Sequence, residues 1–275
     1  MHFIKRSNCP KILVDNQDKW TAPWVAHYRW QKGVSTETKK PNKPTTGYWR
    51  HDEIRLILIK DFHNNCGYCG ESLPTPLHTN KKLRNKNKEE GLNFTSKGDV
   101  DHLISKAIEP EKVYQWSNYI WSCKPCNQLK NEFHDPKYPL LNPSNENDCA
   151  KLIFIEDTGQ YALNVSVHAN SKLTERFKKN EQKTLLNAEE ICKKRRLRAS
   201  RLCQCFISIA SDLNNLNMLS DSSRFTEVIR NIQSRRDTEI QEIKNIIDAP
   251  DFYCLTQEKY QFLLKEYPPV AALLN

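Results

Sequence analysis

Two pairs of cysteines, each with the spacing Cys-x-x-Cys, are the residues of this sequence best suited to chemistry. The first pair is Cys66 and Cys69, and the second is Cys123 and Cys126. Two intervening residues let the chain turn so that both thiolates face one point, and two such pairs make a tetrahedral four-sulfur zinc site. Four sulfur ligands leave no open coordination position, so we expect zinc with a structural role. Two unrelated buried pairs, or a redox-active pair, are the alternative interpretations.

A second group of polar residues lies between and just after the cysteine pairs. In chain order it comprises Asp101, His102, Asn118, Asn127 and Lys130. Hydrolysis in general needs a base for the attacking water and positive charge where the departing oxygen becomes anionic. A histidine with the ordinary pKa of about 6.5 is substantially neutral at cytoplasmic pH and can accept that proton. Taken singly, most histidines and asparagines are surface or packing residues, so only the ordered set carries weight.

The order Asp-His, Asn, Cys-x-x-Cys-Asn-x-x-Lys resembles the ββα-metal motif of HNH endonucleases in their zinc-stapled form. The resemblance covers about residues 62–135, with asparagine at the third signature position. Shorter strings, among them Cys-Gly-Tyr-Cys-Gly-Glu and Leu140-Leu141-Asn142-Pro143, are similar to the HNH nucleases of Septu and retron anti-phage systems. The family usually has proline three residues after the histidine, where this chain has Ser105. Serine permits a looser turn there but removes no catalytic group.

The resemblance implies a role for each residue of the set. Asp101 and Asn127 would bind one divalent ion, and oxygen ligands favour magnesium or manganese over a second zinc. His102 would be the general base that activates water, and Asn118 would brace the loop that aims the histidine. Adjacent side chains of a strand point to opposite faces. Asp101 and His102 therefore share a site only if the strand bends or the two side chains straddle the phosphate.

Two lysines near the motif are candidates for contacts with nucleic acid. Lys130 lies one turn after Asn127 on the same predicted helix face, where its ammonium group would meet a phosphate. Lys106 follows the Asp-His pair closely and belongs to the same group of candidate contacts.

Two more basic stretches lie outside this region. The run from Lys193 to Arg201 places six cations in nine residues, including Arg195 and Arg196, on a predicted helix. Such a run is usually a solvated face, so simple solvation, contact with phosphates and contact with an acidic partner are all open interpretations. The polar tract at 80–91 also has a strong positive excess and is predicted to be an inserted mobile loop.

Short strands and helices predicted from the apolar pattern must position these side chains. A helix is predicted over 51–62, where apolar residues recur on one helical face. From Leu173 onward the composition changes to helix formers. The other predicted elements are strands at 100–103 and 119–122, a helix from Pro125 to about Phe133, and a strand, turn and strand over 151–167.

These elements predict an α+β fold with a ββα-metal (HNH, treble-clef-like) core, a structural zinc and helical segments at both ends. The predicted divisions are an N-terminal helical segment at 1–61, the HNH core at 62–143, a β-hairpin connector at 144–170 and a C-terminal helical region at 171–275.

Composition limits the classes of protein that fit this sequence. The chain has 275 residues, 38% of them hydrophobic and 27% charged, which permits a modest core and argues against wholesale disorder. The net charge of +9 favours a polyanionic partner such as nucleic acid. No stretch approaches the ~18 apolar residues of a membrane span, and the first residues lack the apolar core of a signal peptide. We expect a cytoplasmic protein without disulfides.

The motif therefore predicts a metal-dependent HNH endonuclease that cuts DNA, with RNA not excluded, and with magnesium or manganese as its catalytic ion. The resemblance further implies the effector of an anti-phage defence system that acts with an ATPase partner. The alternative is a zinc-stapled module that binds nucleic acid or protein and has lost its catalytic apparatus. The complete set from Asp101 to Asn127 argues against that alternative.

Overall fold

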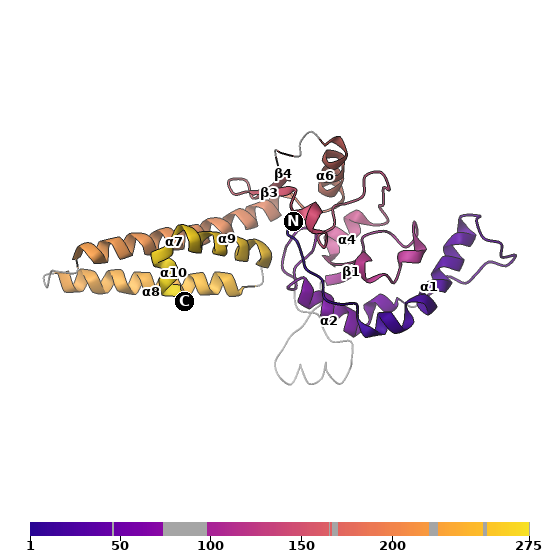
Figure 1. Ribbon diagram of the computed structural model, residues 1–275, viewed down its shortest axis with the longest axis horizontal. Helices are drawn as coiled ribbons and strands as arrows, with labels where there is room; N and C mark the ends of the chain where they lie inside the picture. Colours follow the sequence, from indigo (N-terminus) through magenta and orange to yellow (C-terminus); the bar gives the residue numbers. More distant parts are fainter. Residues whose placement is uncertain are drawn as a thin grey trace. The chain divides into compact units, whose positions relative to one another are not determined.

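The computed structural model (Figure 1) describes residues 1–45, 47–73, 98–164, 166, 170–219, 225–249 and 252–274. The polar tract at 80–91, predicted to be a mobile loop, lies outside these residues. The chain divides into two compact units, the first made of Met1–Phe154 and Tyr161–Ala188 and the second of Ile155–Gln160 and Glu189–Asn275. Helices combine with two small sheets in the described residues, which confirms the predicted α+β class.

Two short antiparallel strands in the first unit carry the motif. β1 spans Gly98–His102 and β2 spans Tyr119–Cys123, and their register pairs Asp101 with Ile120. Every residue of β2 is buried, as expected for a strand covered on both faces. Both strands predicted in this region are confirmed.

A short helix follows the second strand without a connecting loop. α4 spans Lys124–Lys130, and Pro125 lies in its first turn, where a missing N–H leaves no hydrogen bond unmade. The helix was predicted to continue to about Phe133. It ends earlier because Asn131 has a positive φ of 47°, outside the helical region of backbone space.

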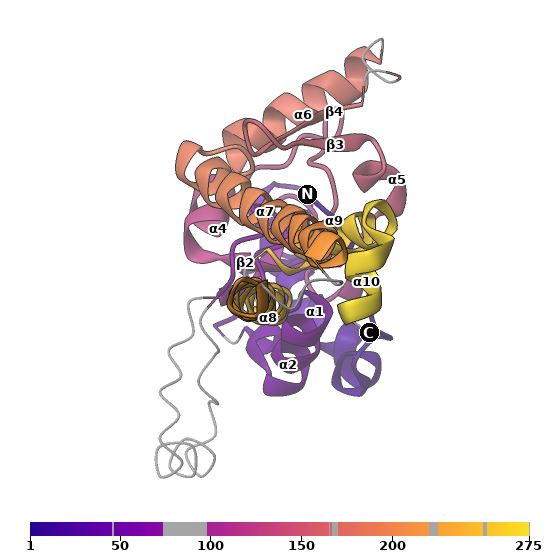
Figure 2. The same ribbon diagram turned by 90° about the vertical axis from the view of Figure 1, so that its left-hand side faces the viewer.

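The helices before the first cysteine pair pack into the same unit. α1 spans Lys11–Gln31, and α2 spans Asp52–Asp61, which confirms the helix predicted there. α2 buries Ile54 and Leu58 on one face, as the apolar spacing indicated. The remaining elements of this unit are the 3-10 helices η1 (Tyr48–Arg50), η2 (Pro110–Lys112) and η3 (Trp116–Asn118), and the helices α5 (Glu146–Cys149) and α6 (Ser171–Lys183; Figure 2).

Arg6 ties the N-terminal segment to the strand that leads into the second cysteine pair. Its Nη1 donates to the carbonyl oxygen of Tyr119 at 2.7 Å, and its Nε donates to the carboxylate of Asp61 at 3.2 Å. The guanidinium carbon also lies 4.1 Å from the ring centroid of Trp116. Residues 1–61 are therefore part of the unit that carries the motif.

A hairpin follows this region, with β3 at Leu152–Ile155 and β4 at Gln160–Leu163. The predicted strand, turn and strand is thus confirmed, with shorter strands. Gly159 in the turn has a φ of +74°, and a Cβ there would lie 2.0 Å from the carbonyl oxygen of Cys192. Only glycine fits this close approach.

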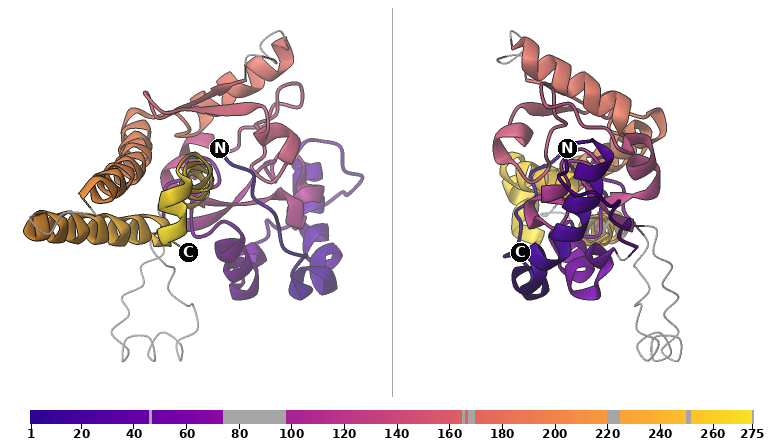
Figure 3. Two further views of the ribbon diagram at one scale, coloured as in Figure 1. Left: turned by 60° about the vertical axis from the view of Figure 1, so that its left-hand side comes forward. Right: turned by 90° about the vertical axis from the view of Figure 1, so that its right-hand side faces the viewer.

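The second unit is helical, as predicted for the end of the chain. Its helices are α7 (Glu189–Leu219), α8 (Thr226–Asp248), α9 (Tyr253–Glu266) and α10 (Pro268–Leu274). α7 and α8 pack alongside each other (Figure 1), and Figure 3 shows the same helices from two further sides. The core that all four helices of this unit share consists of Leu202, Cys205, Phe206, Ile209, Ile243, Ile246, Leu263 and Val270. No helix in the described ranges is long and apolar enough to cross a membrane.

Candidate functional site

The four predicted zinc ligands meet at one buried point. Cys66 and Cys69 lie in the turns after α2, and Cys123 and Cys126 lie at the junction of β2 and α4. Their sulfur atoms all lie within 4.8 Å of one another, and the sulfurs of Cys69 and Cys123 are 4.0 Å apart. Tetrahedral zinc with Zn–S bonds of about 2.3 Å would space its sulfurs by about 3.8 Å. Donor type and spacing therefore fit a four-sulfur zinc site.

Hydrogen bonds to sulfur support this cluster. The backbone N–H of Leu185 donates to Cys126 Sγ at 3.3 Å, and that of Cys126 donates to Cys123 Sγ at 3.4 Å. Burial acts to raise the pKa of Cys66, but hydrogen bonds from Cys123, Cys126 and Cys69 bring this pKa well below its usual range. Cys66 is thus favoured as the thiolate, the form of cysteine that binds metal, whereas interaction with Cys123 raises the pKa of Cys69 and of Cys126.

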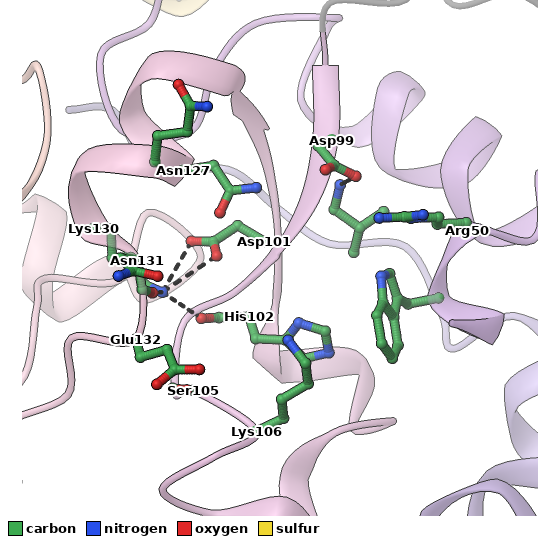
Figure 4. Close-up of a pocket in the computed structure, with 13 residues that line it drawn as sticks. Arg50, Asp99, Asp101, His102, Ser105, Lys106, Asn127, Lys130, Asn131 and Glu132 are labelled. Atoms are coloured by element: carbon green, nitrogen blue, oxygen red, sulfur yellow. Dashed lines mark hydrogen bonds and ion pairs between the residues drawn. The ribbon is translucent and has the colours of Figure 1, made fainter. Parts of the chain in front are cut away.

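A pocket of about 290 Å³ lies beside the strand that carries the Asp-His pair (Figure 4). β1 and the loop after it form one wall, and α4 with the residues that follow it forms another. The predicted site residues that line this pocket are Asp101, His102, Lys106, Asn127 and Lys130. One pocket thus collects the proposed metal ligands and the proposed base.

Asp101 is a buried carboxylate with two side-chain donors. The hydroxyl of Tyr68 donates to Oδ2 at 2.6 Å, and Nζ of Lys130 lies 3.2 Å from each carboxylate oxygen. Burial raises the pKa of Asp101, and the Lys130 ammonium and the Tyr68 hydroxyl oppose that rise. Figure 4 shows the amide of Asn127 turned toward this carboxylate. One carboxylate and one amide oxygen are suitable donors for a hard divalent cation.

His102 points away from that carboxylate, as alternation along a strand requires, yet it lines the same pocket (Figure 4). Its Nε2 lies 2.9 Å from the carbonyl oxygen of Val113, which can only accept, so Nε2 carries the proton and Nδ1 keeps a lone pair. Burial, and next the charge of Lys106, lower the pKa of His102 to about 3. The ring is therefore neutral at neutral pH. Its edge-to-face neighbour in the pocket is Trp49, at a centroid distance of 4.9 Å.

Asn118 lies outside the pocket and fastens the loop that holds His102. Its Oδ1 accepts the N–H of Ile104 at 2.7 Å, and its Nδ2 donates to the carbonyls of Ile104 at 3.0 Å and Lys112 at 2.9 Å. These bonds connect Ile104, just after β1, to Lys112, the last residue of η2. Lys112 directly precedes Val113, whose carbonyl oxygen contacts the imidazole of His102. Asn118 therefore stabilises the loop through its side-chain hydrogen bonds.

Lys130 is not placed as predicted. Its side chain is 1% exposed, and Nζ donates to the carbonyl oxygen of His102 at 2.7 Å as well as to Asp101. The ammonium therefore has protein partners on β1 and does not project toward a phosphate. The predicted phosphate contact is corrected, because the helix face that carries Asn127 packs Lys130 against the strand.

Arg195 also differs from its prediction, because it is buried at 1% exposure. Its Nη1 donates to the carbonyl oxygen of Gly159 at 3.2 Å, so phosphate contact at Arg195 is corrected to a structural role. Arg196 is exposed, and Nη1 donates to the carbonyl oxygen of Asp157 at 3.4 Å. Arg198 donates to the carbonyl of Ala249 at 3.1 Å, beyond the end of α8. Part of the basic run thus holds the second unit together.

The chain resembles a defence protein. It is 28% identical over 145 residues to the Septu protein PtuB of Bacillus thuringiensis. The matched part is 52% of this chain and 42% of PtuB, so the chain spans less than half the length of this curated relative. No protein-family model matches the chain. Similarity to a Septu protein is therefore supported, and the HNH assignment has no family match behind it.

Three contributors to the site were not predicted from sequence. Tyr68 reaches Asp101 from between two cysteines, and Trp49 and Arg50 line the pocket from η1. The position of a tyrosine between two cysteines of the cluster indicates that it lies near that cluster. It does not indicate the direction in which the hydroxyl points. No local pattern distinguishes Trp49 or Arg50, because they reach the pocket only through tertiary packing.

Proposed function

We propose that this protein is a metal-dependent nuclease of the HNH type that hydrolyses phosphodiester bonds in DNA, and that it is the effector of an anti-phage defence system. One observation carries the proposal: a buried carboxylate, an amide oxygen and an imidazole with a lone pair on Nδ1 line one pocket next to a four-cysteine cluster. Similarity to Septu protein PtuB supports the defence role. By the same resemblance, we propose an ATPase subunit as the partner.

Asp101 and Asn127 are the residues that would hold the catalytic ion, magnesium or manganese. Such an ion uses one or two protein ligands and fills its other positions with water and phosphate oxygens, so this small donor set is sufficient. Bound there, it would supply positive charge to the phosphoryl oxygens and the departing oxygen. Zinc at the cysteines has no open position and would be structural.

His102 is the proposed general base. The Val113 carbonyl fixes the proton on Nε2, which leaves Nδ1 to take a proton from water. A pKa of about 3 keeps the imidazole neutral but makes it a weak base. A phosphodiester anion in the pocket would act to raise this pKa, and the divalent ion would act to lower it.

Two cations in the pocket are proposed to bind the phosphate backbone. Lys106 is partly buried, and its Nζ lies 5.3 Å from the ring centroid of Trp49. Burial lowers the pKa of Lys106, with Glu132 and Asp101 opposing the effect. Arg50 is exposed at the mouth of the pocket. Their contacts with phosphate would position DNA without reading its sequence.

Cleavage of a supercoiled plasmid tests the proposal. Wild type with magnesium, in the presence of its ATPase partner, should nick or linearise the plasmid. His102→Ala should lose about 10²–10⁴ in rate, because it removes the proton transfer and leaves the metal ligands in place. A His102→Ala protein that cuts at the wild-type rate would contradict the HNH assignment, and a wild type that does not cut would favour a zinc-stapled binding module.

A further inference from the structure

We propose that Tyr68 is a positioning residue for Asp101, and that it couples the cysteine cluster to the catalytic ion. The inference rests on the proposed function, because it takes Asp101 as a ligand of that ion. Tyr68 stands between Cys66 and Cys69, so a side chain from the turn that carries two cysteines reaches a carboxylate that lines the pocket.

The hydrogen bond between Tyr68 and Asp101 is short and wholly buried. The hydroxyl lies 2.6 Å from Oδ2, within the range of charge-assisted O–H···O⁻ bonds, which are about twice as strong as neutral ones. Tyr68 is 0% exposed and Asp101 is 5% exposed, so water does not compete for either group. Lys130 is the other side chain that donates to this carboxylate among the described residues. Two donors from separate segments therefore fix its orientation.

The backbone of Tyr68 has little freedom to move. The N–H of Gly67 donates to the carbonyl of Trp121 on β2 at 2.8 Å, and the N–H of Gly70 donates to the carbonyl of Cys66 at 2.7 Å. A Cβ at Gly67 would lie 2.5 Å from the ring of Phe62, so the turn packs tightly against α2 and β2. The backbone that carries the Tyr68 ring is thus held by the same turn that carries the sulfurs of Cys66 and Cys69.

Loss of the hydroxyl alone should then weaken binding of the catalytic ion and leave binding of zinc unchanged. Hydrogen-bond partners of metal ligands typically contribute 10–100-fold to metal affinity, because they orient the ligand. Tyr68→Phe keeps the ring and its packing and removes one donor from Asp101. We expect its dissociation constant for Mn²⁺ to rise by about tenfold, at the lower end of that range.

Manganese binding to the zinc-loaded, full-length protein tests this inference without a cleavage assay. Electron paramagnetic resonance of free Mn²⁺ gives the dissociation constants of wild type, Tyr68→Phe and Tyr161→Phe. Tyr161 is a buried tyrosine of β4 that packs on His2 and Phe154 in the same unit, so its variant controls for the loss of a buried hydroxyl. Tyr161→Phe should bind Mn²⁺ as wild type does.

Cleavage kinetics supply a second measurement that a purely structural role would not change. Tyr68→Phe should need about tenfold more magnesium for half-maximal cleavage and should approach the wild-type rate when magnesium saturates. Zinc content should stay at the wild-type value.

Each other outcome has a definite meaning. Equal Mn²⁺ affinity of Tyr68→Phe and wild type would overturn the inference and leave the proposed function standing. Loss of zinc from Tyr68→Phe would also overturn it, because Tyr68 would then be a folding residue. A wild type that binds no Mn²⁺ outside the cysteines would remove the ion site, and with it both proposals.

Discussion

Asp101 and Lys130 illustrate what residue type and spacing determine and what they leave open. The sequence placed both near one site, and the structure brings them to one pocket. The sequence did not predict that Lys130 would be buried against the carboxylate of Asp101, because the burial of a side chain depends on which distant residues pack over it. The burial of His102 against Val113 was likewise not predictable, since Val113 lies eleven positions away in an irregular loop.

Lys130→Met tests the buried ion pair at this scale. Removing one partner of a buried pair leaves an uncompensated charge and typically costs about 3–5 kcal/mol. We expect the free energy of unfolding to fall by about that amount in urea denaturation. Lys178→Met is the control, because Lys178 is exposed and pairs with Glu175 at the surface, where a pair contributes about 0–1 kcal/mol. Similar losses in the two variants would contradict the buried pair.

At the scale of elements, the strands, α2 and the hairpin were predictable because each carries a strong local signal. Apolar spacing predicted α2, and two apolar runs separated by a turn predicted the hairpin. The end of α4 at Asn131 was not predictable, because an asparagine with positive φ has no strong local signature. The loop from β1 to η3 depends on the hydrogen bonds of Asn118, which join positions up to fourteen residues apart.

Asn118→Ala tests whether that loop aims His102. The variant loses three hydrogen bonds and leaves buried backbone groups unpaired, so we expect the free energy of unfolding to fall by about 2–3 kcal/mol. Cleavage should fall at least about tenfold, because the loop that carries Val113 would lose its hydrogen bond at Lys112, and misplaced catalytic groups lose rate.

Asn187→Ala is the matched control for this loss. Asn187 also makes three side-chain hydrogen bonds in the first unit, two with the backbone of Tyr161 and one with Glu181, and it does not line the pocket. Its variant should lose stability and keep its cleavage rate. Equal loss of cleavage in both variants would assign the effect of Asn118 to general destabilisation.

At the scale of the whole molecule, the chain consists of a unit that carries the four-cysteine cluster and a helical unit with a core of its own. Composition predicted the helical end of the chain. It did not reveal that Arg195 and Arg198 of the basic run are internal, because a cation run has the same composition whether it faces water or a neighbouring helix. The attachment of Arg6 to β2 spans 113 positions and left no local signal.

Removal of zinc should unfold the first unit and leave the second unit folded. Cys123→Ser should release zinc and unfold the first unit, because the cysteines join segments more than fifty positions apart. The second unit should remain helical, since its core contains no cysteine of the cluster. Elemental analysis, circular dichroism and limited proteolysis would measure these effects. Soluble protein with an intact first unit and no zinc would contradict the structural role of the metal.

The pocket is proposed to hold both a divalent ion and a separate base. A metal titration of plasmid cleavage tests this proposal most directly. Asn127→Ala should cleave more slowly than wild type at low metal concentration. Rising magnesium or manganese should partly restore its cleavage rate, because the ion keeps Asp101 as a ligand. His102→Ala should stay about 10²–10⁴ below wild type at every metal concentration, because added metal does not replace the base. Rescue of His102→Ala by metal, or identical titration curves for the two variants, would contradict the account.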